Sequence, residues 1–307
     1  MSYYTQRHGM RTPINKTYII DYNMYELLMD CCNGYKLNIA WKYPEECPDG
    51  YGCCGLNEHK LNADLIYEIP TLFRNDSNQI SVPTIYHNIF STKEEKDEYD
   101  QYALLDYIEF IAQNCKDVQK HDFHSYFGHY HLSFSDGNTA FKQYKNEINK
   151  VFEKTGLLYR LTDERIIERI VENSPLTHTI ETSVTQIKEK GLKELLEEAI
   201  ALYKSPYPGD SKDAVEKIWD ALERLKSYYT QFDKKNSINK IVNDMADNQP
   251  DYISVLNDEF IVLTKIGNNY RIRHHETDKV EITDVRYYDY FFNRCLSLIA
   301  LAIQYLK

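Results

Sequence analysis

Two arginines and two histidines lie within five positions of the segment GNNYRIRHHETDK, residues 267–279. These residues, and the glutamate that follows them, are Arg271, Arg273, His274, His275 and Glu276. A guanidinium group can hold two phosphate oxygens at once. An imidazole has an ordinary pKa near neutrality, so it can move protons at neutral pH. These residue types point to phosphodiester cleavage, with all five as candidate catalytic residues.

Either regular secondary structure would cluster arginine with histidine in this segment. In an extended chain Arg271, Arg273 and His275 point the same way, because side chains alternate with a period of two. In a helix Arg271 lies beside both histidines, which follow it at i+3 and i+4. The competing interpretation is a solvated basic connector. The acidic residues that would pair with such a connector are Glu276, Asp278 and Glu281.

Two further groups of residues have side chains that bind metals. The segment HDFHSYFGHYHLSF has H-x2-H and H-x-H spacings that could chelate Zn²⁺, from His121, His124, His129 and His131. A zinc knuckle could instead form from Cys47, Cys53, Cys54 and His59. Neither group has the short paired cysteines typical of structural zinc sites. We therefore favour a packing segment for the histidines and free thiols for the cysteines, and expect no metal or other cofactor.

The composition describes a folded globular protein. The chain has 307 residues, enough for two ordinary domains, with 42% hydrophobic and 27% charged residues. Its net charge of −11 repels a phosphate backbone at long range. An extended, nonspecific nucleic-acid surface is therefore not expected, although a small basic site is compatible with this charge.

The chain carries no pattern that predicts export or membrane insertion. Its start, MSYYTQRHGM, lacks the apolar core of a secretory signal. The apolar stretch LSLIALAIQYL near the end is shorter than the about 20 residues of a membrane span. The seven cysteines are therefore expected to be reduced thiols. We expect a cytoplasmic protein that does not contact a membrane.

Helical periodicity dominates the first part of the chain, which is predicted to form a domain of residues 1–172. The predicted helices span residues 22–35, 61–73, 98–115 and 138–156. Residues 42–60 are rich in proline and glycine and indicate a loop or tight hairpin. Residues 157–171 predict a small β-hairpin, with a short helix over 163–171 as the alternative.

The second part of the chain is predicted to be entirely helical. The polar, proline-containing stretch 172–183 is the candidate linker, and residues 183–307 form the second predicted domain. Its main predicted helices span residues 187–204, 214–229, 251–267 and the tail from Asp284. The predicted fold class is mainly α: a helical N-terminal domain with a small β-hairpin, then a helical bundle.

Both parts resemble bacterial abortive-infection proteins. The words YYTQRHG, HSYFGHYHLSF and INKVFEKTGLLYRLTDERIIERI resemble the N-terminal domain of AbiJ-like proteins. The words AVEKIWDALERLKSYY and NDEFIVLTKIGNNYRIRHHETDK, followed by a closing apolar helix, look like the C-terminal helical domain of such proteins and are similar to the HEPN superfamily. The resemblance implies a sensing or regulatory first domain and an HEPN-like bundle after it.

The HEPN resemblance implies a metal-independent endoribonuclease of antiphage defence. It further implies RNA as substrate, a homodimer, and a phage-derived trigger or partner protein. One histidine would deprotonate the ribose 2′-OH, and Arg271 or Arg273 would stabilise the phosphoryl charge. Arg271 and His275 have three residues between them, which is fewer than in the usual motif. A noncatalytic module that binds nucleotide, RNA or protein is therefore the open alternative.

Overall fold

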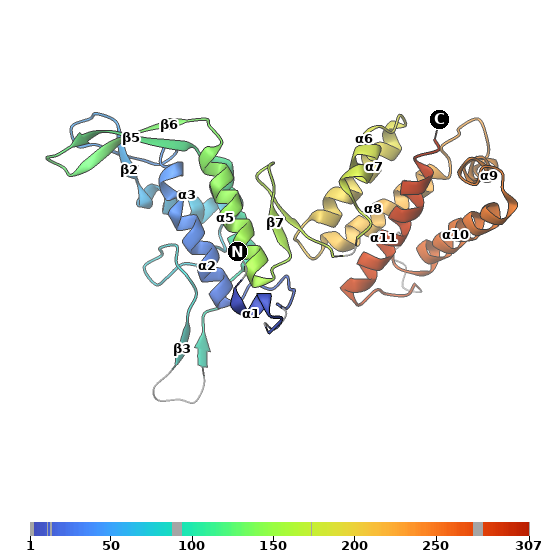
Figure 1. Cartoon of the computed structure of the whole chain (residues 1–307), viewed down its shortest axis with the longest axis horizontal. Coiled ribbons are helices and arrows are strands. Elements are labelled where there is room, and N and C mark those ends of the chain that lie inside the picture. The colour runs from blue at the N-terminus through green and yellow to red at the C-terminus, as the bar shows by residue number, and fades with distance from the viewer. Residues whose placement is uncertain are drawn as a thin grey trace. The chain divides into compact units, whose positions relative to one another are not determined.

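The computed structural model describes residues 3–10, 12, 14–87, 94–172, 174–272 and 279–306. The chain divides into two units, Met1–Arg169 and Ile170–Lys307, each with its own hydrophobic core (Figure 1). Helices predominate in both units, and the strands of the described residues form short antiparallel pairs. The predicted mainly α fold class is confirmed.

Three helices build most of the core of the first unit, and all three lie where the apolar spacing predicts them. They are α2 (Tyr22–Gly34), α4 (Gln101–Asn114) and α5 (Thr139–Thr155). Asp21 caps α2 by accepting a hydrogen bond from the backbone N–H of Met24 at 2.9 Å. Gly156 ends α5 in the left-handed conformation.

The shorter helices of this unit are α1 (Tyr4–Arg7), the 3₁₀ helix η1 (Lys36–Ile39) and α3 (Glu58–Glu68). Helix α3 begins and ends earlier than the predicted 61–73. Asn57 caps its start, accepting from the backbone N–H of Lys60 at 2.9 Å. Pro70 disfavours helical backbone at the residue before it, which accounts for the earlier end.

Two hairpins of the first unit agree with the sequence. Strand β7 (Tyr159–Leu161) pairs with β8 (Ile167–Arg169), so the small hairpin predicted over residues 157–171 is confirmed. Strand β1 (Pro44–Glu46) pairs with β2 (Cys53–Leu56), so the segment rich in proline and glycine forms the tight hairpin and not an open loop.

The apolar pattern predicts neither of the remaining described strand pairs. Strand β3 (Ile85–His87) pairs with β4 (Glu94–Lys96), and β5 (Asp117–His124) pairs with β6 (His129–Ser135). Most residues of β5 and β6 are exposed or half-buried. A hairpin that buries so little surface lacks the alternation of apolar and polar residues by which a strand is predicted.

The second unit is a bundle of helices. Its helices are α6 (His178–Thr185), α7 (Lys190–Lys204), α8 (Asp210–Leu225), α9 (Lys234–Met245), α10 (Pro250–Asn269) and α11 (Val285–Ala302). The predicted helices at 187–204, 214–229, 251–267 and from Asp284 are confirmed as α7, α8, α10 and α11. The predicted linker 172–183 contains most of α6, because α6 packs an apolar side, including the buried Val184, into the bundle core.

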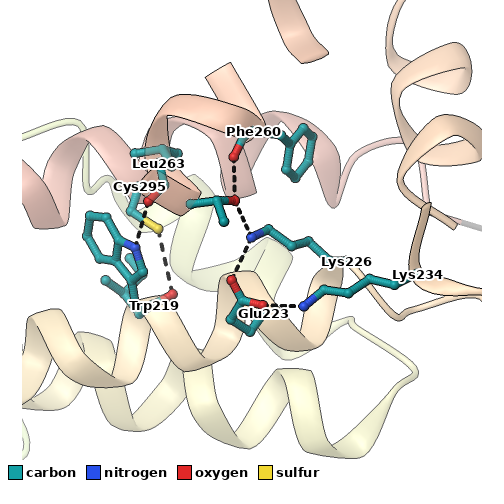
Figure 2. Close-up of polar contacts among 9 residues, drawn as sticks. Trp219, Glu223, Lys226, Lys234, Phe260, Leu263 and Cys295 are labelled. Carbon is teal, nitrogen blue, oxygen red and sulfur yellow. Dashed lines mark hydrogen bonds and ion pairs between the residues drawn. The ribbon is translucent and has the colours of Figure 1, made fainter. Parts of the chain in front are cut away.

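Helix α8 lies against α7 and α11. Two buried polar side chains, one on α8 and one directly after it, make hydrogen bonds to neighbouring helices (Figure 2). The indole N–H of Trp219 donates to the carbonyl of Leu263 on α10 at 3.1 Å. Lys226, 2% exposed, follows α8 directly and donates to Glu223 Oε1 and Thr264 Oγ1, both at 2.5 Å. Lys234 donates to the other oxygen of Glu223 at 2.5 Å. These bonds tie α8 to α9 and α10 through polar contacts.

None of the helices in the described part of the chain has both the length and the apolar character that crossing a membrane requires.

Candidate functional site

Arg271 lies in the described part of the chain, whereas the candidates Arg273, His274, His275 and Glu276 lie outside the described residues. The Nη1 atom of Arg271 is 3.7 Å from Glu281 Oε2, and about a third of the Arg271 side chain is exposed. This ion pair is one that the basic-connector interpretation expects. Such a half-exposed pair contributes only about 0–1 kcal/mol to stability.

The chain on either side of these residues is fixed to the bundle. An isolated parallel bridge joins Tyr270 to Val280. The backbone N–H of Arg271 donates to the carbonyl of Val280 at 3.0 Å. Ile272 and Ile282 are buried in the core of the second unit. The two ends of the segment that carries the candidate residues therefore lie beside each other, between the end of α10 and the start of α11.

A second group of chemically capable side chains meets in the first unit. Cys47, His124, His129 and His131 each offer a metal-ligating atom, and these atoms all lie within 4.8 Å of one another. The group combines one cysteine of the predicted knuckle with three histidines of the predicted histidine cluster. Sequence spacing suggested the two sets separately and did not predict that they meet.

The register of the β5–β6 hairpin accounts for the three imidazoles. His124 and His129 face each other across the hairpin near its turn. His131 follows His129 by two residues, so both side chains lie on the same face of the strand. His121 pairs with His131 in the register, but its Nδ1 lies 2.8 Å from Asp122 Oδ2 and it stays outside the group.

Cys47 reaches the histidines from the turn between β1 and β2. Its backbone N–H donates to the carbonyl of Gly52, and its carbonyl accepts from Gly50, both at 2.8 Å. Gly50 and Gly52 have positive φ angles of 77° and 108°, which a residue with a side chain adopts only under strain. Strand β2 packs against β6, and Cys47 Sγ lies 3.5 Å from His124 Nδ1.

The surrounding polar atoms divide into satisfied and unsatisfied groups. The other ring nitrogen of His124, Nε2, lies 3.3 Å from Asp49 Oδ2, a contact that the sequence alone did not indicate. The Nε2 atoms of His129 and His131 are buried and have no hydrogen-bond partner among the described residues. A buried polar atom without a partner costs about 1–3 kcal/mol.

The other members of the predicted zinc knuckle do not join this group. The thiol of Cys53 donates to the carbonyl of Gly55 at 3.3 Å, and that of Cys54 donates to the carbonyl of Glu45 at 3.4 Å. Burial raises the pKa of both thiols, which favours the neutral form. His59 also lies outside the group, so Cys47 is its one cysteine among the described residues.

A family model described as AbiJ N-terminal domain 4 matches residues 2–186. The match covers the first unit with both hairpins of the Cys47 group, and it continues through α6. No curated protein and no solved structure matches the chain.

Proposed function

Since this chain belongs to the AbiJ N-terminal domain 4 family, a family of abortive-infection defence, we propose that its C-terminal unit is the effector of such a defence. In this proposal the unit is an HEPN-type, metal-independent endoribonuclease. RNA is the substrate, and a phage-derived trigger or partner protein acts through the first unit. The resemblance of residues 214–307 to HEPN domains suggests the activity.

The observation that carries the proposal is the anchoring of the segment beyond Arg271. A catalytic group contributes to the rate only when the fold holds it in place. Here the bridge between Tyr270 and Val280 and the buried Ile272 and Ile282 fix the chain on both sides of the candidate residues. The bundle thus holds both ends of the segment that carries the two arginines and two histidines.

In the proposed reaction, one of His274 and His275 takes the proton of a ribose 2′-OH. The freed oxygen attacks the adjacent phosphorus, and the bond from phosphorus to the 5′-oxygen breaks. The other histidine, or one from a dimer partner, protonates that leaving oxygen. Arg273 holds the phosphoryl oxygens as negative charge builds on them. Arg271 is the weaker candidate for this role because it already pairs with Glu281.

A groove in the same unit favours the noncatalytic alternative. It holds about 690 Å³ between α9 and α10. Its polar lining consists of Lys234, Lys235, Asn239, Asn257, Thr264 and Lys265, and its apolar lining of Ile238, Phe260 and Ile261. Lysines suit phosphates and apolar side chains suit the faces of bases. A unit that only binds nucleotide or RNA would use this groove.

Incubation with total RNA in EDTA tests the proposal. We expect the purified wild type to cleave RNA without metal, and the double variant His274→Ala/His275→Ala, purified identically, to be at least about 100-fold slower. Each reaction is run with and without an extract of phage-infected cells, because the proposal includes a trigger. The double variant also controls for contaminating ribonuclease.

Binding and cleavage measured together separate the two candidate functions. Lys235→Ala/Lys265→Ala should weaken RNA binding if the groove holds RNA. If wild type binds RNA through these lysines and leaves it intact, with or without the extract, the binding module replaces the nuclease. If the double histidine variant cleaves RNA as fast as the wild type, the catalytic assignment is also wrong.

A further inference from the structure

We propose that Cys47, His124, His129 and His131 bind one zinc ion, which fastens the β1–β2 hairpin to the β5–β6 hairpin. The site belongs to the first unit and is independent of the proposed RNA cleavage. Its side chains come from a turn and a hairpin that are 77 residues apart in the chain. A metal ion at this point would therefore act as a tertiary cross-link.

The donor set fits zinc better than the hard cations. Thiolate and imidazole are ligands that Zn²⁺ prefers, whereas Mg²⁺ and Ca²⁺ take oxygen ligands. Four protein ligands complete a tetrahedral shell and leave no open position for water or substrate. The site is thus structural by its ligand count.

The spacing of the donor atoms is close to that of a zinc shell. With Zn–S of about 2.3 Å and Zn–N of about 2.0–2.1 Å, tetrahedral angles place sulfur about 3.5 Å from nitrogen. Cys47 Sγ lies 3.5 Å from His124 Nδ1. All four donors lie within 4.8 Å of one another, so small side-chain rotations would complete the shell.

The unsatisfied ring nitrogens distinguish a metal site from simple packing. A hydrogen bond between Cys47 and His124 could explain their contact, but it leaves the buried Nε2 atoms of His129 and His131 without a partner among the described residues. One metal ion would satisfy both nitrogens at once. Burial without it leaves two polar atoms unpaired, which is unfavourable.

Asp49 supplies the contact that commonly orients a zinc-bound histidine. Such histidines donate their second ring N–H to a carboxylate or carbonyl, which fixes the tautomer and directs the other nitrogen at the metal. The Nε2 of His124 lies 3.3 Å from Asp49 Oδ2, and its Nδ1 is directed towards Cys47. Asp49 is two residues beyond Cys47, so one turn provides both the ligand and the orienting group.

Metal analysis of the purified full-length chain is the test. After removal of any affinity tag under reducing conditions, we expect inductively coupled plasma mass spectrometry to find about one zinc ion per chain. Cys47→Ser and His129→Ala should lose most of this zinc. Cys54→Ser and His121→Ala are matched controls in the same two hairpins, outside the group, and should keep it.

A visible absorption spectrum of the cobalt-substituted wild type tests the site even if the ligand variants fail to fold. Replacing the bound metal with Co²⁺ should produce the visible bands of tetrahedral cobalt and a thiolate charge-transfer band. Metal removal by a chelator should lower the melting temperature of the protein, and zinc should restore it. A wild type that contains no zinc and takes up no Co²⁺ overturns the proposal. So does equal zinc loss in the control and ligand variants.

Discussion

At the scale of single residues, the proposed role of Arg273 depends on the shape of its side chain as well as on its charge. Arg273→Lys keeps the positive charge but loses the planar fork that can hold two phosphate oxygens. If Arg273 stabilises the transition state, we expect the variant to be slower by about tenfold or more, with folding unchanged. Growth arrest after induction in a bacterial host, at matched expression, measures this without a known substrate.

Arg286→Lys is the control for that experiment. Arg286 is 89% exposed and pairs with Asp284 next to the start of α11, so lysine can replace it. His274→Ala is tested beside it as a second disabling change. If the wild type arrests growth and Arg273→Lys and His274→Ala arrest it equally strongly, the catalytic assignment is wrong. The segment is then a basic connector.

The buried ion cluster around Glu223 predicts that two substitutions have unequal costs. Lys226→Met leaves Glu223 paired with Lys234, so we expect a change within about 1–2 kcal/mol. Glu223→Leu leaves the ammonium of Lys226 buried with the hydroxyl of Thr264, so we expect a loss of about 3–5 kcal/mol (Figure 2). Urea unfolding in a Trp41→Phe background, in which Trp219 is the remaining tryptophan, measures both.

The same cluster carries an acid dependence. Burial raises the pKa of Glu223, but hydrogen bonds from Lys226 and Lys234 outweigh it, so the pKa lies below its ordinary value. A carboxyl group whose pKa is lowered in the folded state stabilises the protein fully above the unfolded value of about 4.3. This stabilisation is lost as the pH falls from that value through the lower folded-state pKa. If Lys226→Met and Glu223→Leu lowered the free energy of unfolding equally at neutral pH, the prediction of unequal effects from the buried ion cluster would be wrong.

At the scale of helices, the contact between α8 and α10 reverses the usual effect of replacing a helical glycine. A Cβ atom on Gly267 would lie 2.5 Å from Cδ1 and Nε1 of Trp219. The indole would have to move and would weaken its hydrogen bond to the carbonyl of Leu263. We expect Gly267→Ala to destabilise the second unit by about 1–3 kcal/mol, as overpacking does.

Helix propensity alone predicts the opposite sign for this substitution. Alanine is favoured over glycine in a helix by about 1 kcal/mol. Thermal unfolding of the variant therefore decides between local propensity and tertiary packing. Asn257→Ala, in the same helix on the side of the groove, controls for changes of α10 itself. A higher melting temperature for Gly267→Ala would show that Trp219 does not pack as described.

The longer helices of this protein were predictable because their signals are local. Apolar stripes and end residues such as Asp284 and Gly156 lie within each helix or next to it. The β5–β6 hairpin was missed because its side chains are mostly exposed. The histidine spacing of the proposed zinc site was visible in the sequence. That Cys47 of the candidate knuckle joins these histidines was not visible, since the packing of β2 on β6 is a tertiary contact.

At the scale of the whole molecule, the second unit should fold by itself when it retains the residues before α7. Val171, Leu176, Ile180 and Val184 all contact its core. We expect a fragment of residues 170–307 to be helical and to melt cooperatively. A fragment of residues 183–307 should melt at a lower temperature because it lacks three of these four residues. Circular dichroism showing a random coil for residues 170–307 would contradict the division of the chain.

The surface of the second unit suggests where a second copy of the chain would bind. Of the aromatic residues at the start of α11, Phe291 and Phe292 are buried in the unit's own core. Tyr287 and Tyr290 are 58% and 53% exposed. Aromatic side chains are enriched at protein interfaces. These two tyrosines lie on the helix that follows the candidate catalytic segment, so contact between copies there would bring two such segments together.

We therefore expect a homodimer that depends on Tyr287 and Tyr290. Light scattering of the wild type should give about twice the chain mass of 36.4 kDa. Tyr287→Ser/Tyr290→Ser should shift the protein towards the monomer without a change in circular dichroism. Tyr252→Ser, a similarly exposed tyrosine on α10, should leave the dimer intact. If the proposed site is completed across the dimer, the double tyrosine variant also loses RNA cleavage and regains part of it at high protein concentration. A wild type of about 36 kDa over a wide concentration range would rule out the dimer, and with it a site that needs two copies.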